Sequence, residues 1–152
     1  IRSLGVKLKL SSTKTIVKNK SIILIDDSLV RGTTCHKIIK MLYEAGANEV
    51  HVRIACPQIK FPDYYGVDMP TKEELLAHGK NINEMTKHIN ATSLKFLSLD
   101  GLYLALVGEK RNAIYPQFSD HYFTGDYPIK PSDKLKGLKV KQLSLLSGKS
   151  NS

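Results

Sequence analysis

The stretch that most constrains this chain runs from Ile22 to Thr34 and reads IILIDDSLVRGTT. Its first four residues, Ile22 to Ile25, are apolar without alternation, which is typical of a central strand buried on both faces of a parallel sheet. Asp26 and Asp27 follow at the carboxyl end of that strand, where open α/β sheets hold their ligands. The pattern therefore predicts an α/β protein with a ligand site directly after this strand.

The residues after the two carboxylates have the composition of a loop that binds phosphate. Gly32 permits backbone torsions that a Cβ would forbid, so consecutive N–H groups can point into one concavity. Thr33 and Thr34 add hydroxyl groups beside a helix start, where the helix dipole favours an anion. Ionised Asp accepts hydrogen bonds from sugar hydroxyls and can coordinate Mg²⁺. Together these residue types predict a site for a phosphorylated ribose with magnesium.

A second interpretation of the same residues is purely structural. Asp26, Asp27 and Ser28 are also typical of a helix-capping turn after a buried strand. The order of the whole segment favours the binding interpretation, because a strand, two acids, a hydroxyl, Val30-Arg31 and Gly-Thr-Thr form one long ordered string.

The surrounding pattern predicts a βαβ unit. Residues Thr34 to Ala45 are predicted as a helix whose apolar face contains Ile38, Leu42 and Ala45. Alternation from Val50 to Ile54 favours a strand with one more polar side. The other predicted features are a strand at Gly5 to Leu10, a capping box at Thr71 and Glu74, a helix at Ile82 to Ile89, a strand at Leu94 to Leu97, a helix at Leu99 to Val107 and a loop-rich stretch at Gly108 to Asp126.

At this point the sequence resembles a known family. Residues Ile22 to Thr34 look like the phosphoribosyl-pyrophosphate motif of type I phosphoribosyltransferases, in the form found in amidophosphoribosyltransferases. The flanking segments that agree are GVKLKL (Gly5 to Leu10), EAGANEV (Glu44 to Val50), FPDYYGVDMPTKEELLAHGK (Phe61 to Lys80) and FTGDYPI (Phe123 to Ile129). The resemblance implies a parallel-sheet type I phosphoribosyltransferase fold, which is Rossmann-like and here incomplete at its N-terminus.

The resemblance also implies roles for individual residues. Asp26 and Asp27 would hold the ribose diol and Mg²⁺, and Lys9 would favour departure of pyrophosphate. The implied reaction turns glutamine, phosphoribosyl pyrophosphate and water into 5-phosphoribosylamine, glutamate and pyrophosphate, the first committed step of purine biosynthesis. An alternative is a non-catalytic remnant or regulator that only binds phosphoribosyl pyrophosphate. The residues expected to contact that ligand are Asp26, Asp27, Ser28, Leu29, Val30, Arg31, Gly32, Thr33 and Thr34.

The resemblance extends over about residues 1 to 130, and residues 131 to 152 are expected to be a basic, flexible tail. Members of the family also carry an amino-terminal glutaminase domain with a cysteine nucleophile, and they form homo-oligomers. No residue here matches that nucleophile. The chain is therefore expected to be the carboxy-terminal part of a transferase domain, with the glutaminase domain or chain as its partner.

Cysteine usage bears on both compartment and cofactor. Two cysteines, Cys35 and Cys56, cannot form the framework of a secreted disulfide protein. Cys35 follows the loop at a helix start, where either a lowered thiol pKa or a structural thiol is expected. Some members of the resembled family hold an iron–sulfur cluster, and the corresponding positions here are Asp63, Ser119 and Tyr122. Since none of these offers a thiolate, no iron–sulfur cluster is predicted.

The net charge of +9 and the pI near 9.5 raise the question of nucleic-acid binding. The basic residues gather near the two ends, without the interleaved aromatic residues that a stacking platform requires, so nucleic acid is not the expected partner. The five histidines show no spacing typical of a metal site. No apolar run approaches the roughly 20 residues that cross a bilayer, and the expected location is the cytoplasm.

Overall fold

The computed structural model describes residues 14–68 and 71–129 of the chain. The strand predicted at Gly5 to Leu10 and the tail predicted at 131–152 lie outside these ranges. The elements in order are α2 (Lys14–Val17), β1 (Ser21–Asp26), α3 (Thr33–Glu44), β2 (Glu49–Ile54), the 3₁₀ turn η1 (Lys72–Glu74), α4 (Ile82–His88), β3 (Ser93–Phe96), α5 (Leu99–Val107) and α6 (His121–Thr124). None of the helices in the described ranges has the length and apolar character needed to cross a membrane.

The three strands form one parallel sheet in the order β1-β2-β3. Ser21 lies opposite Glu49 in the first pair, and His51 lies opposite Ser93 in the second. The helix α3 connects β1 to β2, and α4 lies in the connection from β2 to β3. Parallel neighbours need such crossover connections, usually helical ones. The predicted βαβ unit and the α/β class are confirmed.

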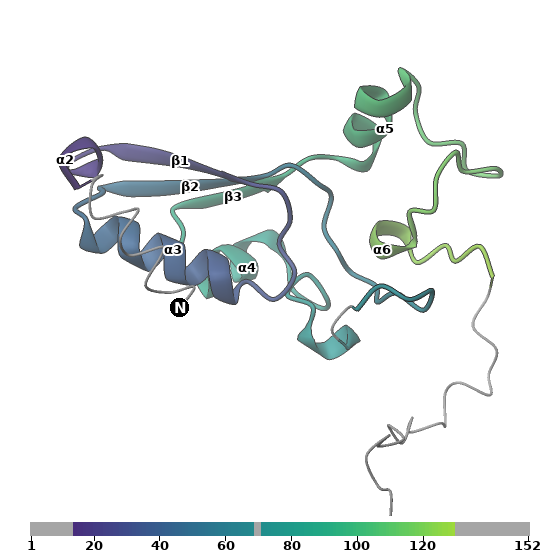
Figure 1. Ribbon diagram of the computed structural model, residues 1–152, viewed down its shortest axis with the longest axis horizontal. Helices are drawn as coiled ribbons and strands as arrows, with labels where there is room; N and C mark the ends of the chain where they lie inside the picture. The colour runs from purple at the N-terminus through teal and green to yellow at the C-terminus, as the bar shows by residue number, and fades with distance from the viewer. Residues whose placement is uncertain (1–13, 69–70, 130–152) are drawn as a thin grey trace, which may run out of the picture.

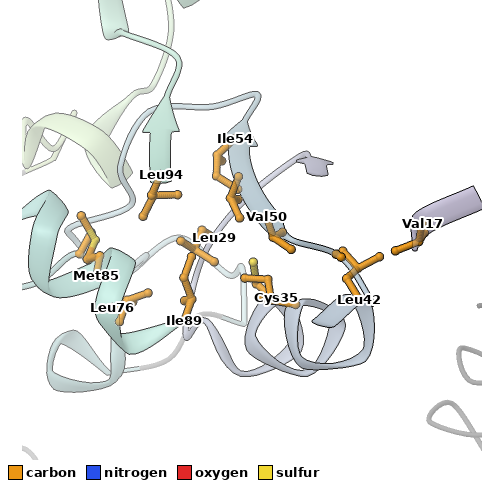
Figure 2. Close-up of a cluster of buried hydrophobic side chains, with 14 residues drawn as sticks. Val17, Leu29, Cys35, Leu42, Val50, Ile54, Leu76, Met85, Ile89 and Leu94 are labelled. Carbon is orange, nitrogen blue, oxygen red and sulfur yellow. The ribbon is translucent and has the colours of Figure 1, made fainter. Parts of the chain in front are cut away.

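The hydrophobic core lies between the sheet and the helices α3 and α4, which cover the same face of it (Figure 1). Figure 2 shows the side chains that meet there, including Val50 and Ile54 from β2, Cys35 and Leu42 from α3, and Met85 from α4. Burying an aliphatic side chain of this kind contributes about 1.5–3 kcal/mol. This layer fixes where the carboxyl end of β1 lies relative to the start of α3.

The buried face of α3 differs from the one predicted. The buried residues of this helix are Cys35, Ile39 and Leu42, which form one row along it. Of the predicted face, Leu42 is right, whereas Ile38 and Ala45 are only partly buried at the edge of the cluster. Ala45 is the C-cap, so it lies past the last helical turn rather than on the face toward the sheet.

The strand β1 is not buried on both faces, so that prediction was wrong. Ile23 and Ile25 are 65% and 73% exposed. Among the described residues, β1 is the edge of the sheet, and both helices of the core cover the opposite face. In register with the two isoleucines lie His51 and Arg53 of β2, which are only partly buried. The unbroken apolar run therefore forms a strand with one partly buried face, that of Ile22 and Leu24, and one exposed face.

The segment of residues 108–129 lies beyond the carboxyl ends of the strands, together with α5 (Figure 1). Arg111 is its central side chain and donates hydrogen bonds to Asp120 and, at 2.8 Å, to Asp126. The hydroxyl of Tyr103 on α5 donates to the same Asp120 at 2.7 Å. Burial alone would raise the pKa of Asp120, but hydrogen bonds from Arg111, Tyr103 and Thr124 outweigh it and lower that pKa.

Asp63 and His121 link this segment to the loop after β2. The Asp63 Oδ1 atom lies 2.8 Å from His121 Nε2, and His121 Nδ1 lies 3.0 Å from Ser119 Oγ. The other carboxylate oxygen of Asp63 accepts hydrogen bonds from the N–H groups of Tyr65 and Val67. Burial would raise the pKa of Asp63, but the bonds from Val67, His121 and Tyr65 outweigh it and lower that pKa to about 2.

Candidate functional site

The loop between β1 and α3 encloses a cavity of about 370 Å³. Ten consecutive residues line it, and they are Asp26, Asp27, Ser28, Leu29, Val30, Arg31, Gly32, Thr33, Thr34 and Cys35. The N–H of Ala55 donates to the carbonyl of Asp26 at 2.9 Å, which ties the end of β1 to β2. All nine residues predicted to contact a ligand from Asp26 to Thr34 thus face one cavity, which we call the cradle.

The two carboxylates of the cradle are held by hydrogen bonds between neighbouring residues. The N–H of Asp27 donates to Asp26 Oδ1 at 3.1 Å, and Ser28 Oγ donates to Asp27 Oδ1 at 3.1 Å. Among the described residues, no donor is bonded to the Oδ2 atom of either Asp. One oxygen of each side chain therefore remains to accept a bond from a ligand hydroxyl or to coordinate a cation.

The same carboxylates fit Mg²⁺ only if a ligand completes its coordination. Within residues 14–68 and 71–129, no group of three or more His, Cys, Asp or Glu side chains is placed to hold a metal ion. Mg²⁺ is usually bound by one or two carboxylates together with water and substrate phosphates. Asp26 and Asp27 match that donor set, so the chemistry of this site fits a magnesium ion shared with a phosphorylated ligand.

The bend that leads from the loop into α3 depends on Gly32, the N-cap of that helix. Its φ of 78° lies in the left-handed region that favours glycine. A Cβ added there would come within 2.8 Å of Leu76 Cδ2 and 3.2 Å of Ile89 Cγ2. Glycine also has no side chain to cap α3, so the first N–H groups of the helix and its positive dipole end are left to an exogenous acceptor. The hydroxyls of Thr33 and Thr34 lie beside them on exposed residues.

The back wall of the cradle is apolar. Leu29 and Cys35 are buried there, and both belong to the core cluster under the sheet. Burial, with a smaller contribution from the charge of Asp26, raises the pKa of the Cys35 thiol to about 11. The helix start therefore does not produce a reactive thiolate, and Cys35 is a structural thiol.

A second, larger cavity of about 510 Å³ lies outside the cradle, between the loop after β2, the end of β3 and the start of α5. Its lining includes Lys60, Lys95 and Ser98 among apolar residues such as Phe96 and Phe123. Neither a carboxylate nor a glycine is among the residues that line it. The donor set for a sugar phosphate with a metal ion is therefore found in the smaller cavity.

The structure places the remaining predicted residues as follows. Lys9 lies outside the described residues, and its role stays a prediction. Asp63, Ser119 and Tyr122, the positions considered for an iron–sulfur cluster, gather around one side chain, His121. That gathering was not predicted, because the pattern of single histidines in the sequence gives no signal for it.

Two contacts behind the cradle were also missed. The capping-box spacing of Thr71 and Glu74 predicted a helix start, and the structure confirms the box. The spacing in the sequence did not predict that Glu74 forms an ion pair with Arg31 of the cradle, at 3.0 Å. The hydrogen bond from the N–H of Leu76 to the carbonyl of Val30, at 2.8 Å, had no sequence signal either.

Comparison with known proteins identifies the fold and the family of this chain. No family model matches the sequence. The chain is 51% identical over 148 residues to the amidophosphoribosyltransferase of Rhizobium etli, covering 97% of this chain and 30% of that protein. It is 47% identical over 139 residues to the amidophosphoribosyltransferase of Staphylococcus epidermidis, covering 91% of this chain and 28% of that protein. The chain thus spans about 30% of the length of the curated relatives it matches.

Two solved structures have a similar fold. One is the glutamine phosphoribosylpyrophosphate amidotransferase from B. subtilis complexed with ADP and GMP, with a TM-score of 0.70 and 40% identity, covering 79% of this chain and 26% of that chain. The other is described as the allosteric regulatory enzyme of purine biosynthesis, with a TM-score of 0.65 and 39% identity. It covers 79% of this chain and 26% of that chain.

The parallel sheet, with its first strand ending in paired carboxylates and a glycine-containing loop, and the similarity to these solved structures place the chain in the type I phosphoribosyltransferase fold class. Within that class, identity near one half over almost the whole chain decides the family. This chain belongs to the amidophosphoribosyltransferase family. The fold class and the family predicted from the sequence are both confirmed.

Proposed function

We propose that this chain binds phosphoribosyl pyrophosphate with Mg²⁺ as the transferase part of an amidophosphoribosyltransferase. The observation that carries the proposal is the cradle, in which Asp26 to Thr34 combine two available carboxylate oxygens with an uncapped helix start behind a left-handed glycine. Family membership supports it, because the relatives are named for this transfer. The complete reaction forms 5-phosphoribosylamine, glutamate and pyrophosphate from phosphoribosyl pyrophosphate, glutamine and water.

In this proposal each end of the cradle holds a different part of the ligand. Asp26 and Asp27 accept hydrogen bonds from the ribose hydroxyls, and the main-chain N–H groups of Ser28 to Thr34 hold the 5-phosphate. Bound Mg²⁺ supplies positive charge to the pyrophosphate group. Lys9 is proposed to stabilise the charge of the departing pyrophosphate. The residues of this chain act by positioning the sugar for displacement at its C1 atom.

The test is isothermal titration calorimetry of the full chain with phosphoribosyl pyrophosphate, with and without Mg²⁺. The double variant Asp26→Asn with Asp27→Asn is expected to lose the Mg²⁺-dependent part of the binding and to keep the fold. A control that removes the same charge elsewhere is Asp100→Asn with Glu109→Gln, two exposed residues at α5. Equal affinity in the wild type and the Asp26/Asp27 variant would contradict the proposal.

A chain that binds without turnover is the alternative. It is separated by an assay that supplies ammonia as the nucleophile in place of glutamine, together with phosphoribosyl pyrophosphate and Mg²⁺. Release of pyrophosphate together with formation of phosphoribosylamine supports the transferase function. Binding by calorimetry without any such product identifies the non-catalytic binder.

A further inference from the structure

The cradle is braced from behind by residues 71–76, which contain η1. The N–H of Leu76 donates to the carbonyl of Val30 at 2.8 Å. The side chain of Leu76 lies so close to Gly32 that a Cβ there would be 2.8 Å from it. Glu74 Oε1 lies 3.0 Å from Arg31 Nη2. Residues 30, 31 and 32 of the cradle are thus each in contact with one short segment, which we call the brace.

Glu74 is the charged member of the brace and uses its two oxygens differently. Oε2 accepts the N–H of Thr71 at 3.0 Å and closes the capping box of η1. Oε1 is the atom paired with Arg31. Hydrogen bonding from the Thr71 N–H, with the nearby charge of Arg31, lowers the pKa of Glu74, so its carboxylate is ionised at neutral pH. One oxygen therefore orders the brace while the other holds the cradle.

The position of Arg31 makes this pair relevant to ligand binding. Arg31 lines the cradle, and its side chain is 53% exposed. A guanidinium released from Glu74 would be free to leave the rim of the cavity or to enter it, and the loop backbone at Arg31 would lose this attachment to the brace. Arg31 and Gly32 are adjacent, so the same backbone carries the ion pair and the left-handed bend.

We propose that Glu74 is a positioning residue of the cradle, which holds Arg31 and the backbone of residues 30–32 in the conformation that accepts the 5-phosphate. This inference rests on the function proposed above. Glu74 does not touch the ligand and acts through Arg31.

The substitution Glu74→Gln isolates the ion pair. Glutamine retains one carbonyl oxygen, which still accepts the Thr71 N–H, but it has no charge for Arg31. The affinity of the full chain for phosphoribosyl pyrophosphate with Mg²⁺, measured by calorimetry, is expected to fall roughly two- to five-fold, the range that exposed ion pairs cover. The thermal unfolding midpoint is expected to stay unchanged. The matched control is Glu73→Gln, which removes the same charge from the neighbouring exposed residue of η1.

A double-mutant cycle tests whether Glu74 acts through Arg31. In an Arg31→Met background, Glu74→Gln is expected to leave the remaining affinity unchanged. Additive losses in the double variant, or an equal loss in Glu73→Gln, would overturn the inference. Unchanged affinity in Glu74→Gln would also overturn it. The same holds for a loss of affinity in Glu74→Gln that is accompanied by a lowered unfolding midpoint. Absence of binding in the wild type removes the proposed function itself, which separates the two failures.

Discussion

The cradle and the segment of residues 108–129 are held in place by different forces. The cradle lies on an apolar layer, where side chains such as Ile39, Val50 and Val52 are fully buried between the sheet and the helices. The segment is held by ion pairs and aromatic contacts instead: Arg111 joins Asp120 and Asp126, Asp63 joins His121, and the His121 ring packs against Tyr65 and Tyr127. Apolar packing is insensitive to pH and has no directional requirement, whereas each polar contact needs its particular partner and charge.

This difference shows which part of the molecule can change without the other. The cradle requires the sheet and α3 to be packed, so damage to the core removes the site. The segment is connected to the loop after β2 and to α5 rather than to the core, so it can be released while the sheet remains folded. The four predictions below test that separation.

The largest effect is expected from the core. Ile39→Ala is expected to lower the free energy of unfolding by about 2–5 kcal/mol, because it leaves a cavity under the sheet. Ile23→Ala removes the same atoms from the exposed face of β1 and is expected to stay within about 1 kcal/mol of the wild type. Urea denaturation followed by circular dichroism measures both. Similar losses in the two variants would show that the exposed face of the sheet is buried in solution.

The polar segment is tested by Arg111→Met, which leaves the buried Asp120 without its cation. Breaking a buried ion pair in this way is expected to destabilise the segment locally by about 3 kcal/mol. Limited proteolysis is expected to cut within residues 108–129 much faster, while the urea midpoint of the sheet is unchanged. Lys110→Met is the control, because the Lys110–Asp100 pair is exposed. A lowered midpoint for the whole chain would contradict the separation of the two regions.

Replacing Gly32 is expected to change stability less than the two variants above, and to weaken ligand binding specifically. Valine in a left-handed conformation is expected to lose about 1–2 kcal/mol. Gly79 has a similar φ of 71° but no atom near the position of a Cβ. Both Gly32→Val and Gly79→Val are therefore expected to lose stability by torsion, and Gly32→Val loses more because its Cβ presses against the buried Leu76 side chain. Only Gly32→Val is expected to weaken phosphoribosyl-pyrophosphate binding in calorimetry, by about ten-fold for each 1.4 kcal/mol of distortion in the cradle.

The smallest effect is a pH dependence of the Asp63–His121 link. The pKa of Asp63 is lowered from 3.8 to about 2 in the folded chain, so its contribution to stability is complete above about pH 4 and is lost as the pH falls toward 2. Proteolysis of the loop after β2 with an acid protease, such as pepsin, is expected to accelerate across that range.

Asp63→Asn is the control for this titration, because the amide cannot gain or lose a proton. Its cleavage rate is expected to lack the acid-dependent step. The same step in the variant would assign the pH dependence to another carboxylate.

Local patterns in the sequence were sufficient to predict most of the sheet and the cradle. The helix α5 lies at Leu99–Val107 as predicted. The strand β2 begins one residue earlier than predicted, and both ends of β3 lie one residue earlier than predicted. The capping box at Thr71 and Glu74 was also right. Each of these features depends on residues close together in the chain, where periodicity and capping chemistry leave a readable signal.

What the sequence did not reveal depends on long-range contacts. Asp63 and His121 are 58 residues apart, and neither has a pattern that points to the other. The short helices α2 and α6 were not predicted, because four residues are too few for a helical period to be recognised. The exposure of Ile23 and Ile25 was missed for a related reason: which neighbours cover a strand is decided by the whole sheet, not by the strand itself.

Because Cys35 is buried, its reactivity can report when the loop between β1 and α3 opens. This thiol lines the cradle, yet it is only 2% exposed and its pKa is about 11, so a thiol reagent can reach and react with it only when the loop opens. In a variant that lacks Cys56, the other free cysteine, the rate of alkylation at Cys35 therefore reports how often the loop and the first turn of α3 open together. A compound that fills the cradle should slow that chemistry, so occupancy can be followed without attaching any dye.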